Sequence, residues 1–147
     1  MPLIGFERSR AIIDRGGRNA PCDECVIERE EGEREAKDVL PGEEYHHLLT
    51  KGRTQNADAA RSAADSRYVC SWLCNHHHTG AGNVHNPAAA RRLLAFNIRL
   101  YGYVKVERAY RAVVDSLHHP INIELPTEEE ALGRHSPQNH LRAAGAV

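Results

Sequence analysis

The chain has 147 residues, with 19 Lys and Arg against 20 Asp and Glu and a formal net charge of −1. It therefore fits a single domain over residues 1–147 and lacks the charge excess of a strong non-specific DNA binder. Only 5% of the residues are aromatic, and such a thin apolar core is typical of a small domain that a metal ion stabilises. No apolar run approaches the roughly eighteen residues of a membrane span, and charges follow the first residues too soon for a signal peptide, so we expect a cytoplasmic protein without a membrane partner. Thiols stay reduced in that compartment, and the four cysteines therefore favour metal binding over disulfides.

The first third of the chain is polar and highly charged. Residues 8–18 form a polar, basic lead-in, and residues 21–26 have the composition of a zinc knuckle on a tight turn. Residues 22–44 hold ten acidic and three basic side chains, a net charge of −7. Within this stretch we interpret residues 28–35 as a solvated, partly disordered excursion.

The middle of the chain alternates between strand-like and loop-like segments. After a Pro-Gly turn, residues 45–49 predict a short strand, and residues 68–73 predict a second one. Between them, residues 50–67 are polar without an apolar period, and we expect a loop with a helical turn through residues 57–64. Glycines in residues 79–83 predict a further turn.

Two helices are expected in the last third. Asn86-Pro87 is typical of a helix start, and apolar side chains at helical spacing predict a helix over residues 87–101 that Gly102 ends. The same spacing continues over residues 103–117, and residues 127–147 are expected to be a polar, frayed tail. The sequence therefore predicts an α+β fold in the order strand, loop, strand, helix.

Two pairs of soft metal ligands predict a structural zinc site. Such sites usually combine two short-spaced pairs from distant parts of the chain. Cys22 and Cys25 form the first pair, and the second is either Cys74 with His77 or Cys70 with Cys74. We prefer Cys74 with His77 because their spacing matches that of the first pair, and a Cys₃His site results.

The remaining histidines predict a second site. His46 and His47 lie on the first expected strand, where alternation points their side chains to opposite faces. One of them can bind a metal while the other reaches a substrate. His78 directly follows the second zinc pair and is left free for another role.

The motifs Cys22-x-x-Cys25, His46-His47 and Leu73-Cys74-x-x-His77-His78 resemble the HNH endonucleases of the ββα-metal (His-Me finger) superfamily. Within it, the chain is most similar to the small phage- and prophage-encoded branch, which often continues into a segment like Gly82-Asn83-Val84-His85-Asn86. The resemblance covers roughly residues 20–110. It implies a small ββα-metal domain with a zinc-stapled core over about residues 20–117 and flanking C-terminal helices.

The resemblance also implies an activity, the metal-dependent hydrolysis of phosphodiester bonds in DNA. His47 would be the general base, and His46 and His78 would hold a catalytic divalent metal, Mg²⁺, Mn²⁺, Ni²⁺ or Zn²⁺. Asn56 is the candidate for the residue that braces the base, and His85 for a third metal ligand or a phosphate contact. The family commonly has Asp where this chain has His46, which leaves the register open.

The expected partner is DNA, double-stranded in the first instance, with phage replication, recombination or packaging proteins as further candidates. Residues 45–127 carry ten basic and five acidic side chains, a net charge of +5, which is compatible with a phosphate backbone. Candidate phosphate contacts are Arg53, Arg91 and Arg92.

Two other functions remain open. One is a non-catalytic zinc-binding module that contacts DNA or protein. The other is a different zinc hydrolase, such as a deaminase or peptidase, which the absence of His-x-Glu and His-Glu-x-x-His motifs disfavours.

Overall fold

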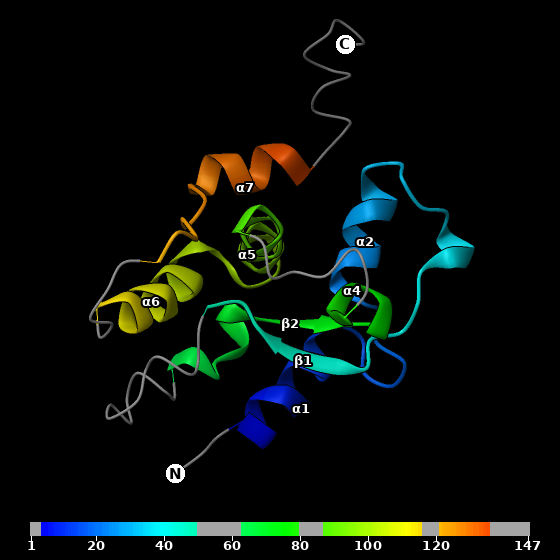
Figure 1. Ribbon diagram of the computed structural model, residues 1–147, viewed down its shortest axis with the longest axis horizontal. Helices are drawn as coiled ribbons and strands as arrows, with labels where there is room; N and C mark the ends of the chain where they lie inside the picture. Colours follow the sequence, from blue (N-terminus) through cyan, green and yellow to red (C-terminus); the bar gives the residue numbers. More distant parts are fainter. Residues whose placement is uncertain (1–3, 50–62, 80–86, 116–120, 136–147) are drawn as a thin grey trace, which may run out of the picture.

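In the computed structural model, the described residues are 4–49, 63–79, 87–115 and 121–135, and side chains are described for all of them except 78, 79, 134 and 135 (Figure 1). Their elements in chain order are α1 (Ile4–Asp14), α2 (Asp23–Glu30), η1 (Ala36–Asp38), β1 (Glu44–His47), η2 (Arg67–Val69), β2 (Cys70–Leu73), α4 (Asn75–Thr79), α5 (Pro87–Tyr101), α6 (Tyr103–Val114) and α7 (Glu128–His135). Helices combined with a two-stranded antiparallel sheet make the fold α+β, as the sequence predicts. Within the described ranges, no helix is both long enough and apolar enough to cross a bilayer.

The sheet fixes where the histidine doublet points. β1 and β2 run antiparallel, with His46 opposite Ser71 and His47 opposite Cys70. Directly paired residues of two antiparallel strands point to the same face of the sheet. His47 and Cys70 therefore share one face, and His46 and Ser71 share the other. All of β2 is buried, whereas β1 is partly exposed.

The observed strands are shorter than the predicted ones. β1 ends at His47, although the backbone N of Leu48 still donates to the carbonyl of Val69 at 3.1 Å. β2 begins at Cys70 because η2 occupies the preceding residues, where the Ser66 hydroxyl accepts a hydrogen bond from the backbone N of Tyr68. A capped 3₁₀ turn thus replaces the start of the expected second strand. The expected helical turn over 57–64 falls largely outside the described residues.

Helix α5 lies at the centre of the molecule. Leu93, Leu94 and Ile98 on its apolar face are at most 1% exposed. The helix contacts α2, β2, η2, α6 and α7, and Figure 1 shows it nearly end-on, with α7 above it, α6 to its left and α2 to its right. The predicted bounds, residues 87–101, are confirmed.

Gly102 separates α5 from α6. Its φ of 94° lies in a region that side chains disfavour, so glycine suits the sharp change of direction between the two helices. Helix α6 buries Val106, Tyr110 and Val113, which follow the predicted helical spacing. It ends at Val114, earlier than the expected residue 117.

The polar, basic lead-in over residues 8–18 includes the end of a helix that the sequence did not predict, because α1 extends to Asp14. Ala11 is the buried residue of this helix. Polar contacts hold it instead: Glu7 accepts hydrogen bonds from the backbone N and from Nη1 of Arg67 at 3.0 and 2.9 Å. A helix anchored in this way leaves only a weak apolar period in the sequence.

The expectation of a solvated, partly disordered excursion over residues 28–35 is wrong about the disorder, although most of these residues are exposed. Helix α2 continues to Glu30, and three acidic side chains of this stretch form ion pairs with arginines. The pairs are Glu28–Arg34, Glu30–Arg99 and Glu31–Arg92. Two of these arginines lie on α5, far from residues 28–35 in the sequence. The charges within residues 28–35 therefore do not reveal these ion-pair partners.

The expected frayed tail contains helix α7. Thr127 and Glu130 form a capping box: the hydroxyl of Thr127 accepts from the backbone N of Glu130, and the carboxylate of Glu130 accepts from the backbone N of Thr127. Ala131 is fully buried where α7 packs on α5. The capping pattern is visible in the sequence. Ala131 alone, however, produces no apolar periodicity that would predict a helix.

A buried polar network connects α1, α2, β2 and α5. The guanidinium of Arg15 donates to both carboxylate oxygens of Asp23 at 2.6 and 2.9 Å, to the hydroxyl of Tyr101 and to the side-chain carbonyl of Asn97. The backbone N of Trp72 in β2 also donates to Asp23. The side chains of Arg15 and Asp23 are only 3% and 0% exposed. Asp23 directly follows Cys22, so this network also fixes the start of α2.

Candidate metal centre and histidine site

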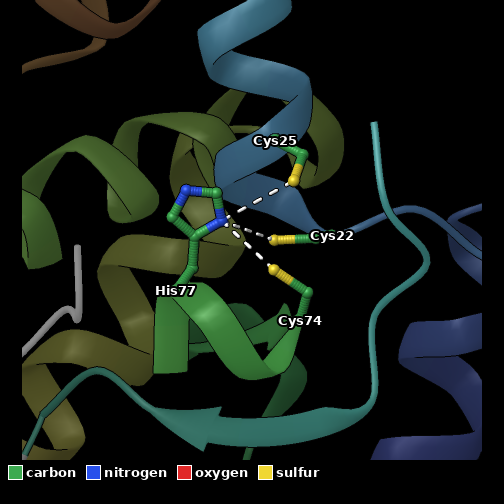
Figure 2. Close-up of side chains that lie close together, drawn as sticks. All are labelled: Cys22, Cys25, Cys74 and His77. Carbon is green, nitrogen blue, oxygen red and sulfur yellow. Dashed lines mark hydrogen bonds between the residues drawn. The ribbon is translucent and has the colours of Figure 1, made fainter. Parts of the chain in front are cut away.

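Four potential metal ligands meet between α2, the end of β2 and α4 (Figure 2). One ligand atom from each of Cys22, Cys25, Cys74 and His77 lies within 4.8 Å of the others, and all four residues are buried. Nδ1 of His77 is 3.4 Å from Sγ of Cys22, 3.6 Å from that of Cys25 and 3.3 Å from that of Cys74. In tetrahedral zinc, Zn–S bonds of about 2.3 Å and Zn–N bonds of about 2.0 Å place sulfur and nitrogen about 3.5 Å apart. The side chains thus have the spacing of a site that could hold a structural metal such as zinc.

Both ligand pairs lie where a helix begins. Cys22 directly precedes α2 and Cys25 is in its first turn, so the first pair lies on a helix start and not on the isolated turn expected from the sequence. The backbone N of Cys22 donates to the carbonyl of Leu40 at 2.8 Å, which fixes this end of α2. Cys74 follows β2, and His77 lies three residues later in α4. Equal spacings therefore give equivalent geometries in the two pairs.

Burial controls the charge of the metal-free cluster. It raises the pKa of the Cys22 and Cys25 thiols and lowers the pKa of the His77 imidazole. These three side chains are therefore neutral near neutral pH when no metal is bound. A divalent cation that binds here displaces thiol protons and supplies the charge that stabilises the thiolates.

Cys70 lies apart from this cluster. Its thiol is buried and donates to the backbone carbonyl of Ala64 at 3.2 Å. The structure thus brings together the preferred ligand set with Cys74 and His77. The alternative pairing of Cys70 with Cys74 does not match the geometry, because Cys70 is not among the grouped ligand atoms and its thiol is directed to Ala64.

His47 forms a close pair with a carboxylate. Its Nε2 is 2.7 Å from Oδ1 of Asp65, and the two side chains are 21% and 6% exposed. An ionised carboxylate only accepts hydrogen bonds, so Nε2 carries the proton and Nδ1 carries the lone pair, which can accept another hydrogen. Tyr45 completes the arrangement, since its hydroxyl donates to the backbone carbonyl of Asp65 at 2.7 Å.

Sequence reasoning missed Asp65. It lies 18 residues beyond His47, in a segment expected to be a featureless loop. The available signal was its place five residues before Cys70, the strand partner of His47, because antiparallel pairing returns the chain to the end of the first strand. Asn56, the expected bracing residue, lies outside the described residues.

The predicted second metal site is described only in part. His46 is partly buried on the face of the sheet opposite to His47. Helix α4, whose backbone includes His78, packs against both β1 and β2. The side chain of His78 and the whole of His85 lie outside the described part of the chain, so the convergence of His46 with His78 stays a prediction.

The predicted phosphate contacts on α5 are engaged with carboxylates. Arg91 lies 2.9 Å from Glu130 of α7, and Arg92 lies 2.6 Å from Glu24 and 3.0 Å from Glu31. A phosphate would have to compete with these partners. Arg53, the third candidate, lies outside the described residues.

Searches against protein-family models, curated proteins and solved structures found no significant match. The function is therefore inferred from the residues and their geometry.

Proposed function

We propose that the protein is a metal-dependent DNA endonuclease of the HNH type, with His47 as its general base. The observation that carries this proposal is the hydrogen bond between His47 and Asp65. A partly exposed imidazole held by a buried carboxylate is the arrangement that orients a catalytic histidine.

The order of elements supports the same proposal. β1, β2 and α4 follow one another, with a Cys₃His cluster where the second strand meets the helix. This is the order that the resemblance implies for a ββα-metal domain. The doublet on β1 directs one histidine to each face of the sheet, so one histidine can bind a metal while its neighbour stays uncoordinated.

In this proposal the residues divide the chemistry as follows. Asp65 holds Nε2–H of His47, and Nδ1 accepts a proton from the attacking water, as neutral imidazoles do near neutral pH. His46 and His78 are the residues that would hold a divalent cation. When bound, that cation supplies Lewis-acid stabilisation of charge on the phosphate and leaving oxygens. Asp65 takes the bracing role that the resemblance suggested for Asn56.

A plasmid-nicking assay tests the proposal. Wild-type protein should nick supercoiled plasmid with at least one of Mg²⁺, Mn²⁺, Ni²⁺ or Zn²⁺, and EDTA should stop the reaction. His47→Ala should lower the rate by about 10²- to 10⁴-fold while zinc content is unchanged. His76→Ala is the matched control, because His76 is an exposed histidine of α4 outside the metal cluster.

The outcomes separate the two leading functions. Nicking that requires His47 but not His76 supports the endonuclease. Zinc-loaded, folded wild-type protein that nicks no DNA with any of these metals would contradict it, and the non-catalytic zinc-binding module would then be preferred. The buried Cys₃His cluster favours that second candidate as much as the first, since both need a structural metal.

A further inference from the structure

The metal cluster has an ordered outer partner that the ligand motifs do not predict. His77 directs Nδ1 at the three sulfur atoms, while Nε2 on the opposite side of the ring lies 3.1 Å from Oε2 of Glu28. The His77 side chain is only 2% exposed, so water has little access to Nε2. Glu28 as a carboxylate can only accept, which places the ring proton on Nε2 and leaves the lone pair of Nδ1 directed into the cluster.

Glu28 is itself held in place. Nε of Arg34 donates to the other carboxylate oxygen, Oε1, at 2.8 Å, and Nη1 of Arg34 donates to the backbone carbonyl of Asp38 at 2.7 Å. Glu28 and Arg34 are 23% and 21% exposed, respectively, so neither side chain is freely solvated. The arginine anchors the carboxylate to the segment that follows α2.

The position of Glu28 follows from the helix. Cys22, Cys25 and Glu28 are each three residues apart at the start of α2 and within it, and residues at this spacing lie along neighbouring parts of one helical face. One helix therefore delivers two metal ligands and the acceptor for a third ligand. The third ligand comes from α4, more than forty residues later in the chain.

We propose that Glu28 is a positioning residue of the metal centre, which selects the Nδ1 ligand form of His77 and holds its ring toward the metal, with Arg34 fixing Glu28. Metal-binding histidines generally donate their second ring N–H to such an acceptor, and loss of the acceptor typically lowers metal affinity by about 10- to 100-fold. The inference concerns the Cys₃His cluster alone and holds whether or not the protein cleaves DNA.

Zinc competition tests this role. Zinc-loaded full-length protein is titrated with a chromogenic chelator, and the zinc affinity is compared among variants. Glu28→Ala should lower the affinity by about 10- to 100-fold, and Glu28→Gln, whose amide oxygen can still accept from Nε2, should lower it less. Glu31→Ala is the matched control: it removes a carboxylate at the end of the same helix that pairs with Arg92 and does not contact the cluster.

A second measurement separates positioning from simple structural support. Nitrogen-15 NMR of the His77 ring in wild-type, zinc-loaded protein should show a protonated Nε2 and a metal-bound Nδ1, and this readout needs no variant to fold. Zinc bound through Nε2 would overturn the proposal, as would a folded Glu28→Ala or Glu28→Gln variant with wild-type zinc affinity and release rate. An equal loss in Glu31→Ala would overturn it too, because the effect would then belong to the stability of α2.

Discussion

At the scale of single residues, the His47–Asp65 pair gives the chain its most distinctive polar contact. Two features distinguish it from a surface ion pair. The side chain of Asp65 is almost fully buried, and the hydroxyl of Tyr45 donates to the backbone carbonyl of Asp65. A carboxylate so restrained fixes both the ring orientation and the tautomer of its histidine. Substitutions at Asp65 therefore test the chemistry without changing His47, the proposed base.

We expect Asp65→Asn to lower plasmid nicking by about 10²- to 10⁴-fold, because an amide can donate to Nε2 and stabilise the wrong tautomer. Initial nicking rates and zinc content are measured on the same preparations. The variant should keep its zinc, because Asp65 is not among the cluster residues. Wild-type nicking by a folded Asp65→Asn protein would show that the base acts without this partner.

The cysteines provide a second comparison between residues. Cys22→Ala should abolish tight zinc binding and leave the protein largely unfolded, since binding to a structural zinc site supplies folding free energy. Cys70→Ser should keep its zinc, because a serine hydroxyl can donate to Ala64 in place of the thiol. Elemental analysis and far-UV circular dichroism check both variants.

If Cys70→Ser released zinc and Cys22→Ala retained it, Cys70 and not Cys22 would be the metal ligand.

At the scale of elements, ion pairs add to the apolar contacts that join α5 to α2 and α7. Helix α5 carries Arg91, Arg92 and Arg99, which pair with acidic residues of α2 and α7. The pairs differ in burial: Glu24 is 9% exposed, whereas Glu130 is 43% exposed. We therefore expect the more buried pair to contribute more to the free energy of unfolding.

We expect Arg92→Ala to lower the free energy of unfolding by about 1–3 kcal/mol, because it leaves the nearly buried carboxylate of Glu24 without its cation. Arg91→Ala, which breaks the exposed pair with Glu130, should lower the free energy of unfolding much less, because solvent screens this pair. Urea denaturation of zinc-saturated proteins measures both. Equal and small losses, with reduced DNA affinity in both variants, would instead favour the role of phosphate contacts predicted from the sequence.

The same contrast explains how much of the fold could be read from the sequence. Helices α5 and α6 were predicted because each buries a periodic apolar face. Helices α1, α2 and α7 were not, because each is anchored largely by charged or small side chains whose partners lie far away in the chain. The four residues of the Cys₃His cluster were predicted because each pair is local, whereas Asp65 and Glu28 became visible only when the fold placed them beside a histidine.

At the scale of the whole molecule, the buried network around Arg15 connects four elements through two charged side chains. Asp23 accepts from Arg15 and from the backbone of β2, and Asn97 of α5 donates to the carbonyls of Tyr68 and Cys70. Because these side chains are buried, water molecules cannot take the place of their hydrogen-bond partners. The network therefore specifies how α1 and α2 sit against the sheet and α5.

We expect Asp23→Asn to lower the free energy of unfolding by about 3–5 kcal/mol, since it leaves the guanidinium of Arg15 buried without a counter-charge. Chemical denaturation in excess zinc isolates this effect from metal loss. Asp38→Asn, at an exposed position in η1, serves as the control. A loss below about 1 kcal/mol, the range of a surface ion pair, would mean that the network tolerates removal of its central charge.

Cys22 and Asp23 are consecutive, so one peptide unit joins the metal cluster to the network that assembles the helices. With zinc as the occupant, the folded fraction of the chain becomes a function of metal supply. Each tenfold rise in free zinc above the dissociation constant adds about 1.4 kcal/mol to the stability of the folded state. A cell that buffers its zinc would thereby also set the abundance of this protein, because chains that fail to acquire the ion stay open to proteolysis.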